Sequence, residues 1–211
     1  MTASVAGNGE PASASTPAPA GSQAEAGVDA TSTVVRPRPK ALVLLGSTAL
    51  AAVAFDQVTK QLVLSELANH DPVRLLGGAL YLNVTRNPGA AFSIGEEFTF
   101  VFPIIALVVF AGVIWLARQL RSVPWAVAMG LVVGGALGNV IDRIFRAPAP
   151  LHGHVVDFLS LFDEAGRVWP IFNVADSALF CGVVLAIFLE FTGRRRDGTR
   201  EPAKARSGDP G

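Results

Sequence analysis

Four apolar stretches, separated by more polar connections, run along the chain. They cover residues 41–64, 98–116, 125–141 and about 169–191. Each stretch is close to the ~20 residues that an α-helix needs to cross a bilayer. The pattern therefore predicts an all-α membrane protein with four transmembrane helices, in which residues 41–192 form the membrane domain.

Two of the connections, residues 65–97 and 142–168, are longer than a simple turn requires. Long connections in small proteins usually carry functional sites or are disordered. The first contains a β-prone apolar run, residues 79–85, and then the turn signal Asn87-Pro88-Gly89. This pattern predicts a small β-structured platform within residues 65–97 that lies on the membrane.

The two ends of the chain differ from the membrane domain. Residues 1–34 are rich in Ala, Ser, Thr, Gly and Pro and contain no Lys or Arg, so we expect residues 1–40 to be a disordered extension. A secretory signal would need a basic start and an apolar stretch, which this segment lacks, so the first apolar stretch is expected to remain as a membrane span. Residues 193–211 are expected to form a basic, disordered cytoplasmic tail.

Basic residues gather beside three ends of the predicted spans. An even number of spans places both termini on one side of the membrane, and cytoplasmic loops carry an excess of Lys and Arg. We therefore expect both termini in the cytoplasm and an extracytoplasmic β platform. The basic residues are Arg36, Arg38 and Lys40 before the first span, Arg118 and Arg121 after the second, and Arg194, Arg195 and Arg196 after the fourth.

The composition agrees with a small multi-pass membrane protein, because 51% of the residues are apolar and the mean hydropathy is +0.45. The 17 basic and 17 acidic side chains balance. This balance argues against a general nucleic-acid binder, which carries a concentrated basic surplus. The single cysteine, Cys181, excludes an internal disulfide, and its apolar neighbours predict a buried core residue.

The third span carries a small-residue face. Gly130, Gly134 and Gly138 recur at every fourth residue and so lie on one side of a helix, where they permit close approach of another helix. Asn139 follows directly. A polar amide at that depth needs a partner inside the bundle.

Two of the aspartates in the membrane domain have a cation nearby in the sequence. Lys60 follows Asp56 by four residues, and Arg146 follows Asp142 by four residues. In a helix each pair could form an ion pair, which favours a structural role for both aspartates.

Asp157 and Asp176 have no such local partner and lie in strongly apolar sequence. Asp176 is expected about seven residues into the fourth span, roughly 10 Å along the helix, and Asp157 on a connection apolar enough to fold back onto the bundle. Two carboxyls that face each other in a partly dry site share one proton, which gives one acid and one base near neutral pH. An aspartic protease needs this arrangement, in which the base takes a proton from water and the acid protonates the scissile carbonyl.

Three other interpretations compete with this one. The aspartates could only tie the helices together, or they could serve a small transporter or membrane scaffold, although no internal repeat is evident and the carboxylates lie toward one face. A metallohydrolase could use His152, His154 and Asp157, although the sequence offers no evident fourth ligand. Loss of activity with a chelator would favour the metallohydrolase.

Five motifs identify a family resemblance. In their order along the chain, they resemble those of lipoprotein signal peptidase, also called signal peptidase II, over roughly residues 41–192. The motifs are Asp56-Gln57-Val58-Thr59-Lys60, Arg86-Asn87-Pro88-Gly89-Ala90-Ala91-Phe92-Ser93, Gly134-Gly135-Ala136-Leu137-Gly138-Asn139-Val140-Ile141-Asp142-Arg143, Val155-Val156-Asp157-Phe158 and Phe172-Asn173-Val174-Ala175-Asp176-Ser177.

The resemblance implies an aspartic endopeptidase of the bacterial plasma (inner) membrane. Its substrates would be prolipoproteins, cut just before a cysteine that carries diacylglycerol, and its other partner would be membrane lipid. The resemblance implies neither a metal nor another cofactor, and we expect a monomer that does not bind nucleic acid. By position, the catalytic aspartates fall on Asp157 and Asp176, and Asp142 is the obvious rival.

The resemblance also implies roles around the aspartates. Asn87 and Asn173, the latter three residues before Asp176 on the same helix, are expected to bind the peptide backbone, and Asp56 is expected to hold the first helix in register. The remaining supporting or substrate-contacting residues are expected to be Gly89, Asn139, Asp142, Arg143 and Ala175, and Lys60 is expected to be structural beside Asp56.

Overall fold

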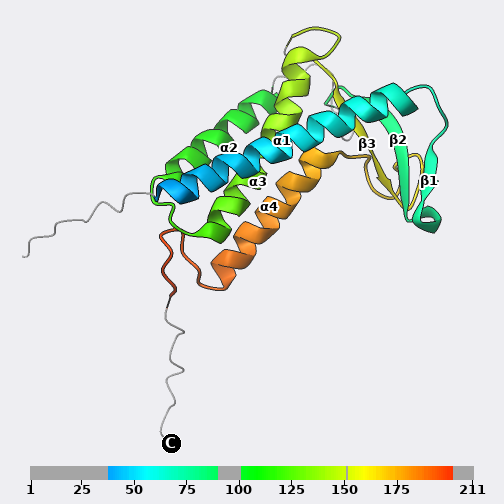
Figure 1. Cartoon of the computed structure of the whole chain (residues 1–211). Helices are drawn as coiled ribbons and strands as arrows, with labels where there is room; N and C mark the ends of the chain where they lie inside the picture. Colours follow the sequence, from blue (N-terminus) through cyan, green and yellow to red (C-terminus); the bar gives the residue numbers. More distant parts are fainter. Residues whose placement is uncertain (1–37, 90–100, 151, 202–211) are drawn as a thin grey trace, which may run out of the picture. The chain divides into compact units, whose positions relative to one another are not determined.

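The computed structural model describes residues 38–89, 101–150 and 152–201 (Figure 1). Most of the predicted N-terminal extension therefore lies outside the described residues. The helices are α1 (Pro39–Leu67), α2 (Val101–Ala117), α3 (Val123–Phe145) and α4 (Val174–Phe191), and the strands are β1 (Val73–Leu75), β2 (Leu80–Asn87) and β3 (Val155–Leu161), with a short 3₁₀ helix, η1 (Leu76–Gly78), after β1.

Three of the four helices, α1, α3 and α4, are long and apolar enough to cross a membrane. The helix α2 is apolar but has 17 residues, and the segment 90–100 before it lies outside the described residues. The predicted fourth span thus stays a prediction. Both α1 and α3 have proline in the first turn, where its fixed φ suits a helix and its missing N–H is not needed.

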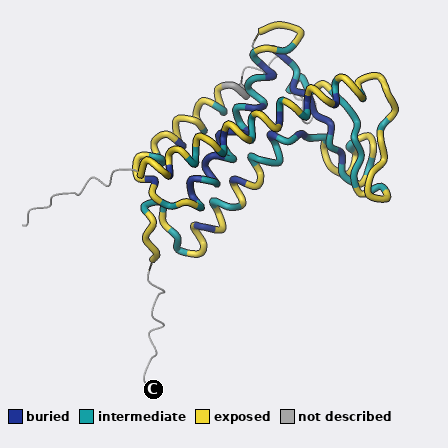
Figure 2. Tube along the Cα trace, in the orientation of Figure 1, coloured by how far each residue is buried: buried dark blue, intermediate teal, exposed yellow. Residues whose placement is uncertain are grey.

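Helix α3 is the central helix of the bundle. Half of the residues in the most apolar part of α3 are buried, compared with 17% of the residues in the most apolar part of α1 and of α4 (Figure 2). The predicted glycine face lies against α1, because a Cβ on Gly130 would lie 2.7 Å from the Cβ of Thr48 and a Cβ on Gly134 would lie 2.7 Å from the Ala49 carbonyl oxygen. The expected close approach of two helices is therefore confirmed.

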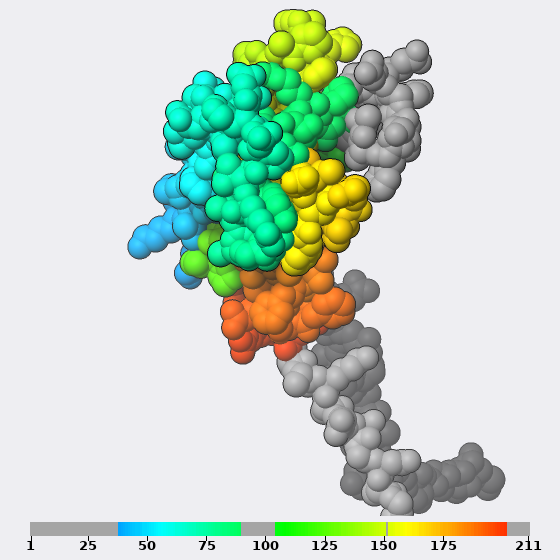
Figure 3. All heavy atoms as spheres, turned by 90° about the vertical axis from the view of Figure 1, so that its right-hand side faces the viewer, coloured from blue at the N-terminus to red at the C-terminus, as the bar shows by residue number. Residues whose placement is uncertain are grey.

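The β platform is a three-stranded antiparallel sheet with the order β1-β2-β3. Two strands come from the predicted segment, residues 65–97, but the third comes from the second long connection. Figure 3 shows β1 and β2 (teal) next to the region of β3 (yellow). No strand was predicted in this connection, although Val155-Val156 and the apolar residues that follow are typical of a buried strand.

The sheet lies at one end of the bundle, and the start of α1 and the end of α4 lie at the other (Figure 1). Backbone hydrogen bonds hold that second end together. Arg38 N–H donates to the Leu120 carbonyl at 3.0 Å, and the N–H groups of Arg121 and Ser122 donate to the Arg196 carbonyl at 2.8 and 3.0 Å. The three basic sites that sequence analysis singled out are therefore neighbours.

The first part of the predicted disordered tail is folded. Residues 193–201 return in a turn, in which Arg194 and Arg200 form an isolated β-bridge and Glu201 N–H donates to the Gly193 carbonyl at 2.9 Å. The guanidinium of Arg196 lies over the ring of Trp125, 5.6 Å from its centre. Composition alone could not predict the contact of Arg196 with Trp125, because the two residues lie far apart in the sequence.

Cys181 is exposed and not buried as predicted. In a helix that crosses a membrane, apolar residues face lipid as well as the protein core. Apolar neighbours in the sequence therefore do not indicate which face a residue occupies.

Gly135 gives a test of the packing of α3 on α4. A Cβ at Gly135 would meet the carbonyl oxygen of Ala175 and the N–H nitrogen of Leu179, the latter at 2.7 Å, whereas a Cβ at Gly112 on α2 would meet no atom within 4 Å. We expect Gly135→Ala to destabilise the protein by about 1–3 kcal/mol, because the backbone of α4 must move. Thermal unfolding in detergent measures the effect.

Gly112→Ala is the matched control, since it makes the same change in an exposed helix position. It should leave the midpoint of unfolding unchanged or raise it slightly, because alanine favours a helix over glycine. Equal midpoints for the two variants would contradict the close contact between α3 and α4.

Candidate active site

The connection into α4 is tied to β3. Phe172 N–H donates to the Leu159 carbonyl at 2.9 Å, and the Phe172 carbonyl accepts from the N–H groups of Phe158 and Leu159 at 3.0 and 2.8 Å. Asn173 follows directly and is the N-cap residue of α4. This short link holds the first turn of α4 beside the strand that carries Asp157.

Asn173 and Asp176 form a capping box at the start of α4. The side chain of Asn173 accepts from Asp176 N–H at 2.9 Å, and the Asp176 carboxylate accepts from Asn173 N–H at 3.1 Å. Asp176 is therefore in the first helical turn, not seven residues into a span, and Asn173 caps the helix. An Asn three residues before an Asp, ahead of an apolar run, is a capping signature that could have placed this start.

Asp157 is held by two asparagine side chains. The Nδ2 of Asn87 donates to Asp157 Oδ2 at 2.9 Å, and the Nδ2 of Asn173 donates to Oδ1 at 2.6 Å. Gly89 N–H donates to Asn87 Oδ1 at 2.8 Å, which fixes the orientation of that amide. Both oxygens of the buried carboxylate thus have donors.

A register shift in the sheet makes the contact between Asn87 and Asp157 possible. Leu82 pairs with Leu159, but Thr85 pairs with Asp157, so β2 gains one residue relative to β3 between these pairs. A shift of one residue moves side chains to the opposite face of a strand. Because of the shift, Asn87 and Asp157 are on the same face of the sheet.

Asn139 on α3 connects this group to Asp176. Its Nδ2 donates to Asp176 Oδ1 at 2.7 Å, and its Oδ1 accepts from Asn173 Nδ2 at 3.0 Å and from Lys60 Nζ at 3.1 Å. The inward partner that sequence analysis required for Asn139 is therefore present. Amide side chains link Asp157 and Asp176 into one hydrogen-bonded group.

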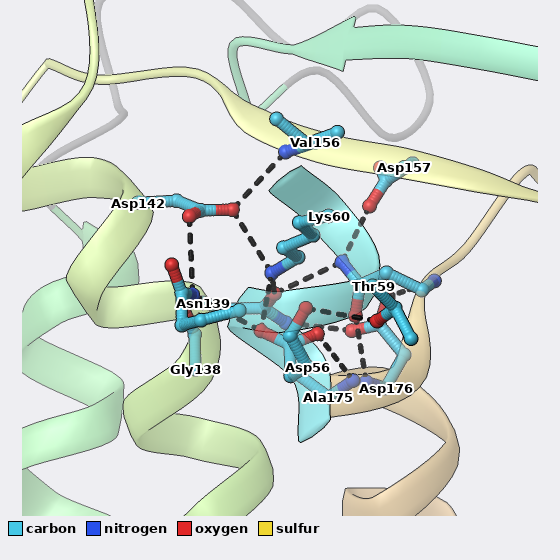
Figure 4. Close-up of polar contacts among 12 residues, drawn as sticks. Asp56, Thr59, Lys60, Gly138, Asn139, Asp142, Val156, Asp157, Ala175 and Asp176 are labelled. Atoms are coloured by element: carbon cyan, nitrogen blue, oxygen red, sulfur yellow. Dashed lines mark hydrogen bonds and ion pairs between the residues drawn. The ribbon is translucent and has the colours of Figure 1, made fainter. Parts of the chain in front are cut away.

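A buried ionic cluster that includes Lys60, Asp56 and Asp142 lies beside Asn139 (Figure 4). Lys60 Nζ is 2.8 Å from Asp56 Oδ2 and 2.9 Å from Asp142 Oδ2, and all three side chains are fully buried. Arg146 Nε is 2.5 Å from Asp142 Oδ1. Both predicted ion pairs are confirmed, and Lys60 also joins α1 to α3 through Asp142, a contact that no local spacing indicates.

The cluster also holds backbone groups of the site. Asp56 Oδ1 accepts from Ala175 N–H, in the first turn of α4, at 2.8 Å, and Asp142 Oδ2 accepts from Val156 N–H, on β3, at 3.2 Å. Sequence analysis assigned no role to Gln57, whose Nε2 donates to both carboxylates and to a backbone carbonyl of α3. A polar amide next to Asp56 inside an apolar span was the available signal.

The carboxyl of Asp157 has a perturbed pKa. Burial raises this pKa, and the nearby carboxylate of Asp176 raises it further. The hydrogen bonds from Asn87 and Asn173 and the charge of Lys60 act in the opposite direction. Together these effects raise the pKa of Asp157 to about 7, so this group can hold or release a proton near neutral pH.

A pocket of about 230 Å³ opens over the two aspartates. Its apolar walls come from α2, α3, β3 and α4, and the α2 wall was not foreseen from the sequence. Asp142 and Asn173 are not among the described residues that line it, and both are fully buried. The polar side chains that line it are Asn87, Asn139, Arg143, Asp157 and Asp176.

Arg143 interacts electrostatically with both Asp157 and Asp176. It is 5% exposed and comes from the last turn of α3. The site thus contains a cation that sequence spacing did not associate with either aspartate.

The histidines of the metallohydrolase interpretation do not form a ligand set. His152 Nδ1 lies 3.2 Å from the Pro150 carbonyl oxygen. Within residues 38–89, 101–150 and 152–201, no three His, Cys, Asp or Glu side chains come together in a way that could hold a metal ion.

Comparison with known proteins identifies relatives along most of the chain. It is similar to the lipoprotein signal peptidase of Streptomyces griseus, with 46% identity over 171 residues, which cover 81% of this chain and 84% of the relative. The lipoprotein signal peptidase of Mycobacterium avium is 43% identical over 79% of this chain and 89% of its own length.

Two solved structures of bacterial membrane enzymes are similar to this chain in fold. One bacterial membrane enzyme is 31% identical, with a TM-score of 0.61 over 74% of this chain and 96% of its own. A second bacterial membrane enzyme is 29% identical, with a TM-score of 0.62 over 80% of this chain and 98% of its own. The sequence pattern of the family described as signal peptidase (SPase) II matches residues 48–192. The chain therefore belongs to the signal peptidase II family, and its apolar helices agree with the membrane setting of a bacterial peptidase of that family.

Proposed function

We propose that this protein is an aspartic endopeptidase that cleaves the signal peptide from bacterial prolipoproteins, on the N-terminal side of the diacylglyceryl-modified cysteine. One observation carries the proposal. Asp157 and Asp176 line the same pocket, and Asn173 donates to both of them, through its Nδ2 to Asp157 and through its backbone N–H to Asp176. Family membership supports prolipoproteins as the substrates.

In the proposed reaction Asp157 is the acid and Asp176 is the base. The raised pKa of Asp157 supports a proton on that carboxyl. Asp176 lies in the first turn of α4, where its carboxylate accepts from the Nδ2 of Asn139 and from the N–H of Asn173. Asp176 takes a proton from water as the water oxygen bonds to the scissile carbonyl carbon, while Asp157 protonates the carbonyl oxygen.

The tetrahedral intermediate then collapses. The proton on Asp176 passes to the leaving nitrogen of the cysteine as the C–N bond breaks, and Asp157 regains its proton from a hydroxyl of the intermediate. The products at this point are the free amine of the lipid-modified cysteine and the carboxylic acid of the signal peptide, which then exchange protons with water to give an ammonium and a carboxylate. The dyad returns to one shared proton, so no metal ion is needed for the balance.

Asn87, Asn139 and Arg143 are proposed to contact the substrate. Each lines the pocket, and among the described residues the Nδ2 of each asparagine donates to one acceptor, an aspartate, so its second hydrogen is left for the substrate. Preorganised donors of this kind stabilise the developing oxyanion. Asn173 is fully buried and uses its Nδ2 on Asp157 and Asn139, so we assign it to holding the aspartates, in place of the peptide contact expected from the sequence.

An apolar pocket of about 160 Å³ lies between α2 and α3 and adjoins the pocket that Asp157 and Asp176 line. We assign it to an acyl chain of the diacylglyceryl group, which would reach it without leaving the lipid phase. This assignment also requires α2 to border the membrane as the fourth span. The two pockets share Ala106, Val109, Ala136 and Val140 as lining residues.

We propose that both termini are cytoplasmic and that the pocket opens toward the outer face of the plasma membrane. The clustering of the three basic sites at the end opposite the sheet supports this orientation.

The first test is cleavage of a diacylglyceryl-modified prolipoprotein by the purified protein. Asp157→Asn and Asp176→Asn should each lower the rate by at least about a hundredfold, because each removes one of the two proton-transfer groups. Both variants should unfold at nearly the wild-type temperature. Cleavage by the wild type should persist in the presence of a chelator.

Asp142→Asn serves as the comparison variant in the same assay. It should lower the stability by about 3–5 kcal/mol, because it removes one partner of a buried ionic cluster, and should affect the chemistry less. Full activity of either dyad variant, together with a folded but inactive Asp142→Asn, would move the assignment to Asp142.

The pH dependence gives a second test. Because Asp157 must be protonated, kcat/KM should fall on the alkaline side with a midpoint near its pKa of about 7. The hydrogen bond from Asn87 lowers this pKa. Asn87→Ala should therefore move the alkaline limb to higher pH.

Asn83→Ala is the control for this shift. Asn83 lies on the same strand, but its Nδ2 donates to the Glu164 carbonyl at 2.7 Å, away from Asp157. Its profile should match the wild type. An alkaline limb that stays in place in Asn87→Ala would exclude Asp157 as the group that titrates.

A further inference from the structure

We propose that Lys60 is a positioning residue for the dyad, and that its ammonium fixes the direction of the Asn139 amide and thereby the hydrogen bond to Asp176. This inference rests on the proposed function and goes beyond the structural role expected for Lys60 from the sequence. Lys60 is fully buried and does not line the pocket, so it acts through Asn139 and not on the substrate.

The ammonium of Lys60 has acceptors on two helices. It is 2.8 Å from Asp56 on its own helix, 2.9 Å from Asp142 on α3 and 3.1 Å from the side-chain oxygen of Asn139. These three acceptors use its three N–H donors. An ion pair with Asp56 alone would not require the contact with Asn139, which is the contact that leads to the site.

The contact determines which way the Asn139 amide points. An ammonium group can only donate, so the side-chain oxygen of Asn139 must face Lys60. The same oxygen accepts from Asn173 Nδ2, and the amide nitrogen is then directed at Asp176, 2.7 Å away. In the flipped orientation a donor would face the ammonium and an acceptor would face the carboxylate of Asp176.

The chain of oriented hydrogen bonds extends through Asn173 to Asp157. The oxygen of Asn173 accepts from Asp176 N–H, so its Nδ2 is free to donate to Asp157 at 2.6 Å and to Asn139 at 3.0 Å. Lys60 is therefore one side chain away from Asp176 and two side chains away from Asp157. Its charge also acts directly, because it lowers the pKa of Asp157.

Lys60 belongs to a cluster of balanced charges and is the cation of that cluster that contacts Asn139. Asp56 on α1 and Asp142 on α3 balance the charges of Lys60 and Arg146, so this cluster is formally neutral. The other charged groups that face the site are Arg143 from α3, Asp157 from β3 and Asp176 from α4. Of the two cations in the neutral cluster, Lys60 contacts Asn139, and Arg146 contacts Asp142 and Gln57.

The experiment compares Lys60→Met with Arg146→Met in the cleavage assay with wild-type protein as reference. Both variants remove a cation from Asp142. For Lys60→Met we expect kcat to fall at least about tenfold while KM stays within about twofold, because the dyad loses its alignment and the proposed substrate contacts of Asn87 and Arg143 remain. The alkaline limb of its pH profile should move to higher pH.

Arg146→Met should lower the unfolding temperature but keep kcat and the position of the alkaline limb. Parallel changes of kcat, pH profile and stability in the two variants would overturn the proposal and leave Lys60 with a structural role. If Lys60→Met does not fold, Lys60→Gln removes the charge while keeping a polar side chain. An unmoved alkaline limb in Lys60→Gln would also overturn the proposal.

A double-mutant cycle with Asn139→Leu tests the route of the effect. If Lys60 acts through the Asn139 amide, Lys60→Met should lower kcat much less in the Asn139→Leu background than in the wild type. Equal losses in both backgrounds would overturn the proposed route. A failure of the proposed function is separate, since it would appear as no cleavage by wild type or as active Asp157→Asn and Asp176→Asn variants.

Discussion

The need to satisfy every buried charge and amide inside an apolar bundle governs this structure. Away from water, a carboxylate or an ammonium is tolerated only when its hydrogen-bonding groups find partners. Lys60 meets this need by joining Asp56 and Asp142, and those carboxylates in turn accept from backbone N–H groups of α4 and β3. The cluster that neutralises the buried charges therefore also fixes where the two elements of the site lie.

The partners of the carboxylates divide them into two classes. Asp56 and Asp142 contact cations directly, so each carboxylate is held in an ion pair. Asp157 and Asp176 instead accept from amide and backbone N–H donors. Amides orient a carboxylate without neutralising it, which suits these two aspartates to the proton transfers of the proposed reaction. The same apolar protein thus contains carboxylates that hold the fold and carboxylates suited to proton transfer.

The features that local spacing determines could be predicted from the sequence. The apolar stretches predicted α1, α3 and α4 to within several residues, and the four-residue spacings predicted both ion pairs. The glycine repeat predicted the close approach of α3 to another helix, which the structure identifies as α1. The pairing of β3 with β2, the register shift and the bridge from Lys60 to Asp142 could not be predicted. Each depends on a partner distant in the sequence, as does the folded turn of residues 193–201.

The position of the pocket connects the proposed substrate to the proposed chemistry. A peptide that carries a diacylglyceryl group needs polar groups at its scissile bond and an apolar path for its lipid. The pocket lined by the two aspartates provides the polar groups, and the adjoining apolar pocket between α2 and α3 provides the path. Asp157 is buried beside these walls, and burial is the largest cause of its raised pKa. In the proposed reaction, the apolar surroundings that admit a lipid-modified substrate therefore also raise the pKa of the catalytic acid to about 7. An enzyme of this design does not need a separate device to tune its acid, because the apolar environment required by the substrate already does so.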